Sequence, residues 1–330
     1  MAKIKETDYL FLSTRVKCLE CSLLSRERME RMLEARTVED AAKVLQECGY
    51  AEMARVSQEE LDQVIAQQRH KTMEDLSSVA PDPRLIDVFK IKYDYHNVKV
   101  LLKADAMGVS ADRLLVDAGR VKADVLADGL RNAELRGVSY ILRKAVSDAR
   151  DVLSTTGDPQ LADFILDRAY FAEMFELAKA TGSSFLEGYV RISIDAANLR
   201  SLVRVLRMGK GPEFLRSVLF EGGNIHTSRV LAASGGSMEE LYAASDLKEA
   251  AAAGAAALNG GGLTRFEKLC DDGVNHYLAG AKYVAFGEAP VIGYLAAKEN
   301  EFTAVRIILT GRMAGLDADT IRERLREAYV

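Results

Sequence analysis

Apolar residues recur along most of the chain with the spacing of an α-helix. In the stretch 195–211, Leu199, Leu202, Val203 and Leu206 lie at i, i+3, i+4 and i+7, so they share one face of a helix. Clean alternation of apolar and polar residues between turn signals, which would indicate strands, is absent. Only 5 prolines interrupt the 330 residues. The pattern therefore predicts an all-α fold.

One helix pattern occurs three times. Two copies have an acid, an asparagine, a base and a Met-Gly pair at the same offsets, while the third keeps the acid, the base and the glycine. The first copy is Asp94, Asn97, Lys99, Met107 and Gly108; the second is Asp195, Asn198, Arg200, Met208 and Gly209; the third is Glu301, Ala304, Arg306, Ala314 and Gly315. Because each glycine follows the last helical turn, we predict a positive φ at Gly108, Gly209 and Gly315.

The segment after each helix is also similar. Asp117, Gly119 and Val121 match Glu221, Gly223 and Ile225, each 104 residues later. The N-terminal region has a fainter version, with Arg15 followed by "LLSRERMERML". We therefore expect segments from both ends of the chain to close the third domain.

The repeat spacing indicates units of domain size. The acids lie 101 and 106 residues apart, far beyond the usual solenoid periods of about 20–50 residues. We predict three helical domains with approximate boundaries 1–110, 111–214 and 215–330, which exchange some segments. Similar units usually arrange by rotation about an axis, so we expect a pseudo-threefold body.

Composition and charge exclude several classes of function. The formal net charge is −5, without the strongly basic balance expected of a nucleic-acid-binding domain. The N-terminus has no signal-peptide pattern. The longest apolar run, Ala250–Leu258, is far short of the roughly 20 residues that span a bilayer. These features predict a chain without a membrane span.

Candidate chemistry is sparse. Cys18 and Cys21 form one CxxC pattern without the further ligands of a zinc site, so we interpret them as small apolar residues on one helix face. The glycine-rich stretches lack the phosphate-loop spacing. Asp271 and Asp272 have no second acidic cluster to complete a magnesium site. The histidines form no ligand pair; they are His70, His96, His226 and His276. We therefore predict no catalytic, cofactor or metal residues.

The repeated polar residues allow two interpretations. They form networks that hold each helix to its neighbour, since buried polar groups are hydrogen-bonded, or some of them line a shared cavity and meet a partner. A basic stripe, Arg204, Arg207 and Lys210, continues from Arg200 along one side of the second helix. It is a candidate partner contact, and the alternative is an ordinary solvated face.

Four stretches together resemble the C subunit of the archaeal and bacterial A/V-type ATPases, whose eukaryotic relative is the d subunit of the vacuolar ATPase. They are "FGEAPVIGYLAAKENEFTAVRIILTGRMAGLDADTIRERLREAYV", "FLEGYVRISIDAANLRSLVRVLRMGKG", "YDYHNVKVLLKA" and "LLSRERMERMLEARTVEDAAKVL". The similarity covers essentially the whole chain. Ala304 departs from the family pattern, which more usually has asparagine there.

The resemblance implies a fold and a role. It implies three similar helical domains around a pseudo-threefold axis, in the shape of a funnel. It implies a non-catalytic rotor protein in the central stalk, which couples the D and F subunits of the shaft to the membrane proteolipid ring for ion transport or ATP synthesis. It also implies a peripheral position on the cytoplasmic side, with membrane contact only through the ring and with neither cofactor, small-molecule substrate nor nucleic acid.

Two alternatives remain open at this point. One is a helical scaffold or adaptor of another assembly. The other is a helical enzyme that uses the Asp271/Asp272 pair with magnesium.

Overall fold

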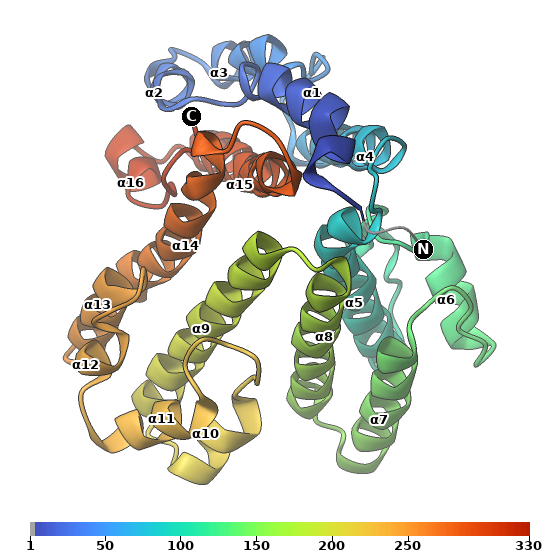
Figure 1. Cartoon of the computed structure of the whole chain (residues 1–330), viewed down its shortest axis with the longest axis vertical. Helices are drawn as coiled ribbons and strands as arrows, with labels where there is room; N and C mark the ends of the chain where they lie inside the picture. Colours follow the sequence, from blue (N-terminus) through green and yellow to red (C-terminus); the bar gives the residue numbers. More distant parts are fainter. Residues whose placement is uncertain (1–3) are drawn as a thin grey trace. The chain divides into compact units, whose positions relative to one another are not determined.

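The computed structural model describes residues 4–330, and all regular structure in that range is helical (Figure 1). The all-α prediction is confirmed. The chain divides into two compact units: unit 1 combines Met1–Pro81 with Ala233–Val330, and unit 2 is Asp82–Ala232. Unit 2 contains the first and second copies of the repeated helix, and unit 1 contains the third. No helix among the described residues is long and apolar enough to cross a membrane.

Unit 2 is built from long helices joined by short turns. Its helices are α5 (Arg84–Met107), α6 (Ala123–Arg131), α7 (Tyr140–Thr156), α8 (Pro159–Thr181), α9 (Ser184–Arg207), α10 (Pro212–Val218) and α11 (Thr227–Ala232), with a 3₁₀ turn at Asp112–Leu114. Helix α8 packs against α5, α7 and α9. The two repeated helices, α5 and α9, end on the same side of unit 2 in Figure 1.

Unit 1 joins the two ends of the chain. Its helices are α1 (Leu10–Glu20), α2 (Arg26–Glu34), α3 (Val38–Val44), α4 (Gln58–Ser77), α12 (Met238–Tyr242), α13 (Lys248–Leu258), α14 (Leu263–Ala279), α15 (Glu288–Met313) and α16 (Ala318–Arg322), with 3₁₀ turns at Glu6–Tyr9, Leu45–Cys48, Ala233–Gly235 and Gly280–Tyr283.

The core of unit 1 explains why both ends are needed. Buried side chains of the N-terminal helices and the turn after α3, such as Met32, Leu45 and Ile65, form one cluster with Phe302 and Ile308 of α15. Burying a leucine- or isoleucine-sized side chain contributes about 1.5–3 kcal/mol, so the N-terminal helices and α15 stabilise one another. Segments from both ends of the chain therefore share one core in unit 1.

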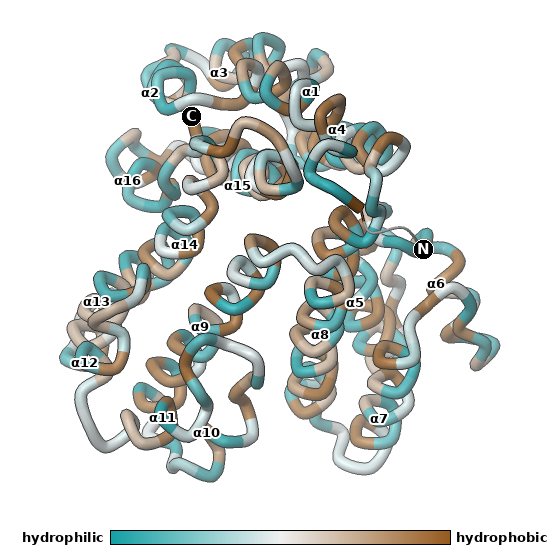
Figure 2. Tube along the Cα trace, in the orientation of Figure 1, coloured by the Kyte–Doolittle hydropathy of each residue, from teal (hydrophilic) through white to brown (hydrophobic). Residues whose placement is uncertain are grey.

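The predicted faces of α9 agree with its burial. Leu199, Leu202 and Val203 are buried, whereas Arg204 and Arg207 are exposed. Figure 2 shows the same mixture of apolar and polar residues along the long helices of each unit.

Glycines end the three repeated helices as predicted. The φ angles are 64° at Gly108, 65° at Gly209 and 73° at Gly315. A side chain with a Cβ would cost about 1–2 kcal/mol in this left-handed conformation, which explains why the three copies share the residue.

Candidate functional site

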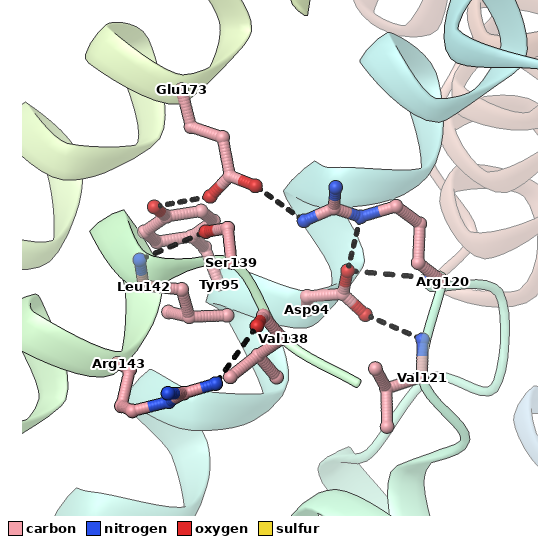
Figure 3. A network of polar contacts seen from close by, with 9 residues as sticks. All are labelled: Asp94, Tyr95, Arg120, Val121, Val138, Ser139, Leu142, Arg143 and Glu173. Carbon is pink, nitrogen blue, oxygen red and sulfur yellow. Dashed lines mark hydrogen bonds and ion pairs between the residues drawn. The ribbon is translucent and has the colours of Figure 1, made fainter. Parts of the chain in front are cut away.

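The acid of the first copy fixes a loop to its helix. Asp94 of α5 is fully buried, and its Oδ1 accepts a hydrogen bond from the N–H of Val121 at 3.2 Å. Its Oδ2 accepts one from the N–H of Arg120 at 3.3 Å. Val121 lies two residues before α6, so the carboxylate holds the loop that leads into this helix (Figure 3). We call this arrangement a carboxylate clasp. In a clasp, an acidic side chain on a long helix accepts a hydrogen bond from the backbone N–H of the residue two positions before a short helix.

The second copy repeats the clasp in detail. Asp195 of α9 is buried, and its Oδ1 accepts from the N–H of Ile225 at 3.0 Å. Its Oδ2 accepts from the N–H of Asn224 at 3.0 Å and from the side-chain amide of Asn224 at 2.9 Å. Ile225 lies two residues before α11, as Val121 does before α6. Both acids therefore hold equivalent points of the chain.

The asparagines of both copies complete the attachment. Asn97 donates to the carbonyl of Val116 and accepts from its N–H, both at 2.8 Å. Asn198 makes the same pair of bonds with Phe220, also at 2.8 Å. Each asparagine thus pairs with both the N–H and the carbonyl of a half-buried residue that lies outside a helix.

Two glycines allow each carboxylate to approach the backbone. A Cβ at Gly119 would lie 2.0 Å from Oδ1 of Asp94, and one at Gly223 would lie 2.2 Å from Oδ1 of Asp195. No side chain fits at these distances. The matched glycines of the sequence are therefore explained by the clasp.

The third clasp is formed by residues from opposite ends of the chain. Glu301 of α15 accepts a hydrogen bond from the N–H of Leu24 at 2.7 Å, and Leu24 lies two residues before α2. Tyr50 donates its hydroxyl to the same carboxylate at 2.6 Å. Lys298 forms an ion pair with Glu301 at 2.6 Å, and both side chains are buried. The repeat pattern of the sequence does not assign Leu24 or Tyr50 to this copy.

Ala304 replaces the asparagine for a local reason. The residue five positions before Leu24 is Leu19, which corresponds to Val116 and Phe220 in the other copies. Leu19 lies in the last turn of α1, and its carbonyl accepts from the N–H of Ser22 at 3.0 Å. Its backbone is therefore paired within the helical turn, so the third copy does not need an asparagine.

The first clasp carries an additional charged network. Arg120 pairs with Asp94 through Nε at 3.3 Å and with Glu173 of α8 through Nη2. Tyr95 donates its hydroxyl to Glu173 at 2.8 Å. Figure 3 shows the arginine between the two buried carboxylates. The network fastens α8 to the first clasp. In the second copy the equivalent residue is Asn224, which carries no charge and so cannot form the same ion pairs.

Burial controls the titration of the clasp residues. Desolvation raises the pKa of Asp94, although the hydrogen bonds from Val121 and Arg120 oppose this change. It also raises the pKa of Asp195, against the opposing effect of the bonds from Ile225 and Asn224. The pKa of Tyr50 is raised because the ring is buried and lies against Glu301.

The basic residues of the repeat lie outside the clasps. Lys99 pairs with Asp167 of α8, and Arg306 pairs with Asp62 of α4 at 2.7 Å. Arg200 is half-buried. The basic stripe, Arg204, Arg207 and Lys210, is exposed at the end of α9.

The candidate catalytic acids are engaged in structural contacts. Arg326 donates to Asp271 at 2.9 Å, and the N–H of Glu327 donates to Asp272 at 2.8 Å. Lys268 also pairs with Asp272. Within residues 4–330, no group of three or more His, Cys, Asp or Glu side chains is placed to hold a metal ion. The pair therefore fastens the C-terminal segment to α14.

The cysteine interpretation needs correction. Cys18 and Cys21 were expected to pack as small apolar residues, but both thiols are exposed, while Cys48 and Cys270 are buried. The face of α1 that is buried is formed by Leu12, Ser13 and Val16 instead.

Comparison with known proteins gives a consistent result. The family model for the ATP synthase (C/AC39) subunit matches residues 12–324. The C subunit of the V-type sodium ATPase of Enterococcus hirae is 23% identical over 326 residues, which cover 98% of this chain and 99% of that protein. The C subunit of the V-type ATP synthase of a Thermus thermophilus strain is 24% identical over 329 residues, covering 96% and 98%. The C subunit of the A-type ATP synthase of Haloferax volcanii is 26% identical over 263 residues, covering 74% and 75%.

Proposed function

This chain belongs to the ATP synthase (C/AC39) subunit family, and on that premise we propose that it is the central-stalk protein that couples the D/F shaft of a rotary ATPase to the proteolipid ring. Its place as a non-catalytic subunit of a V-type or A-type ATPase follows from the family. The transmission of torque between shaft and ring is the part that we propose. The family match over residues 12–324 carries the proposal.

The proposal includes a three-part architecture. We propose that the three clasps mark three equivalent units and that these units surround a pseudo-threefold axis as a funnel that receives the shaft. The approximate domain boundaries 1–110, 111–214 and 215–330 belong to the same proposal. A coupling that turns must be rigid, and buried, fully hydrogen-bonded carboxylates in each unit are suited to that role.

The proposed position is peripheral, on the cytoplasmic face of the membrane, with contact through the ring. The contact surface includes the basic stripe, Arg204, Arg207 and Lys210, which is exposed at the end of α9 on a chain of net charge −5. Acidic groups on the shaft or the ring are its proposed partners. ATP hydrolysis or synthesis takes place on other subunits.

A reconstitution experiment tests the coupling role. The purified chain is mixed with the D/F shaft alone, with the proteolipid ring in detergent alone, and with both, and the products are separated by size. We expect two binary complexes and one ternary complex in which the shaft and the ring meet only when the chain is present. A chain that binds neither component, or a shaft that joins the ring equally well without it, would contradict the proposal and would favour an adaptor of another assembly.

A further inference from the structure

The segment Arg326–Val330, which follows α16, lies beside the third clasp. All five of its residues line a cavity of about 150 Å³, and Leu24 and Glu301 of the clasp line the same cavity. Ala304, where the other two copies have asparagine, lines it as well. Figure 1 shows the end of the chain next to α2 and α15. The segment therefore forms one wall of a small space, and the clasp forms another.

Two acids of α14 hold the first half of this segment. Arg326 donates to Asp271 at 2.9 Å, and the N–H of Glu327 donates to Asp272 at 2.8 Å. Asp272 is buried, and a buried carboxylate needs hydrogen-bond donors. Leu325, the residue before the segment, belongs to the core cluster of unit 1. The residues after Leu325 can therefore leave the surface without disturbing that core.

Tyr329 holds the second half of the segment through a slot in unit 1. Its hydroxyl oxygen is buried, and burial raises the pKa of Tyr329. A Cβ at Gly293 of α15 would lie 2.7 Å from this oxygen and 2.7 Å from the Cβ of Ala281. The ammonium of Lys282 lies 4.8 Å from the centre of the tyrosine ring, where a cation is attracted to an aromatic face. Because glycine inside a helix is destabilising relative to alanine, the space that Tyr329 and Ala281 occupy explains Gly293.

The segment is held at separate points rather than packed along its length. Residues 325–330 have no regular secondary structure. The cavity beneath the segment also deprives its lining atoms of dispersion contacts. Parts of a fold with few buried apolar contacts open at a lower free energy than the core helices. The segment is therefore suited to leave and return while the rest of unit 1 stays folded.

We propose that Arg326–Val330 is a releasable strap, anchored by Tyr329, that controls the access of water to the third clasp. With the strap in place, the carboxylate of Glu301 keeps the N–H of Leu24 in a closed, buried environment. When the strap leaves, the cavity opens, and water competes with Leu24 for the carboxylate. The hold of α15 on the turn between α1 and α2 then weakens. The strap acts within the folded chain, whether or not the chain couples a shaft to a ring.

Hydrogen exchange of the full-length chain tests the control of the clasp. In Tyr329→Ala the amide of Leu24 is expected to exchange several-fold faster than in the wild type. Val121 and Ile225, the equivalent amides of the other two clasps, should keep their rates. Leu61, a buried residue of α4 whose N–H donates to Ser57 at 2.9 Å, should also keep its rate, although it belongs to unit 1.

Trypsin provides an independent measure of release. Cleavage after Arg326 requires the segment to leave the surface, so its rate follows the population of the released state when opening and closing are fast. We expect Tyr329→Ala to be cut at this site several-fold faster than the wild type. Tyr140→Ala is the matched control, because it makes the same substitution in α7 at a side chain that is 75% exposed. It should change neither the cleavage after Arg326 nor the exchange of Leu24.

Three outcomes would overturn the proposal. If Tyr329→Ala is cut faster while Leu24 keeps its wild-type exchange rate, the segment is released without any effect on the clasp. If Leu61 accelerates as much as Leu24, the substitution destabilises unit 1 as a whole and the strap has no specific role. If neither cleavage nor exchange changes, Tyr329 is not the anchor.

Discussion

The N–H of Leu24 lies 2.7 Å from the carboxylate of Glu301, although 277 residues separate the two in sequence. In the first copy the equivalent N–H, that of Val121, comes 27 residues after its acid. In the second copy the N–H of Ile225 comes 30 residues after its acid. In the third copy the partner comes from the other end of the chain. The repeated unit is therefore permuted in unit 1, and the C-terminal copy cannot complete its clasp until the N-terminal helices have packed on α15.

Removal of Glu301 should be strongly destabilising. Glu301→Ala leaves the buried ammonium of Lys298 without its partner, and breaking a buried ion pair in this way costs about 3–5 kcal/mol. Denaturant unfolding measures the loss. The double variant Lys298→Met, Glu301→Ala should recover part of it because the orphaned charge is gone. A double variant as unstable as Glu301→Ala would show that the hydrogen bonds to Leu24 and Tyr50 dominate.

The glycines beside the acids should not tolerate a methyl group. The Cβ of Gly119→Ala would lie 2.0 Å from a carboxylate oxygen of the first clasp, and that of Gly223→Ala would lie 2.2 Å from one of the second. In each variant the loop must therefore shift and the hydrogen bonds of the clasp must lengthen. We expect each to cost about 1–3 kcal/mol, the usual range for overpacking. Gly235→Ala is the matched control, since a Cβ there meets nothing within 4 Å. The explanation fails if all three variants unfold at the same denaturant concentration.

The sequence identified these positions without revealing their connection. Helical periodicity predicted the all-α fold, and constant offsets singled out Asp94, Asp195 and Glu301. The matched pair Gly119 and Gly223 was visible, but a spacing does not say which side chain a glycine makes room for. The N-terminal partner of Glu301 was harder to find, because Ser22 occupies the position of the clasp glycine and Leu19 lies in a helix.

Asparagine should stabilise the protein at position 198 but not at position 304. Asn198→Ala leaves the N–H and carbonyl of Phe220 without partners, and an unsatisfied buried group costs about 1–3 kcal/mol. Ala304→Asn should bring no stabilisation, because the backbone of Leu19 is already paired within α1. Thermal unfolding of both variants checks the prediction. A more stable Ala304→Asn protein would contradict the explanation given for this departure from the repeat.

The pH dependence of stability should report on Asp195. Burial raises its pKa in the folded protein, so the folded state binds the proton more tightly than the unfolded state does. The stability that the raised pKa contributes is fully present at a pH below the pKa of Asp195 in the unfolded state. It is lost as the pH rises through the pKa of Asp195 in the folded state. The difference in unfolding free energy between wild type and Asp195→Asn should therefore shrink as the pH rises across the acid range. Other carboxyls are common to both proteins and cancel in the difference. A difference that grows with pH would show that the hydrogen bonds from Ile225 and Asn224 outweigh burial.

The charged network around Arg120 could not be read from the sequence. Arg120 corresponds to Asn224 in the second copy and Leu23 in the third, so no repeat marked it. Glu173 is buried in α8, between residues that show no repeated pattern. Its role depends on the packing of α8 against α5, a tertiary contact that periodicity does not specify.

Charge reversal of the basic stripe separates partner contact from ordinary surface. Arg204 and Arg207 are exposed at the end of α9, so Arg204→Glu with Arg207→Glu should leave the melting temperature of the isolated chain nearly unchanged. If the stripe meets acidic groups on the shaft or ring, reversal replaces attraction with repulsion that costs several kcal/mol. The assembled complex should then dissociate, or its ATP hydrolysis should become uncoupled from ion transport, and the defect should be larger at low salt because screening weakens both attraction and repulsion. Arg131→Glu with Arg136→Glu is the matched control, because these side chains are 75% and 79% exposed and the net charge changes equally. If both double variants couple ATP hydrolysis to ion transport at the wild-type level, the partner-contact prediction is wrong and the stripe is an ordinary solvated face.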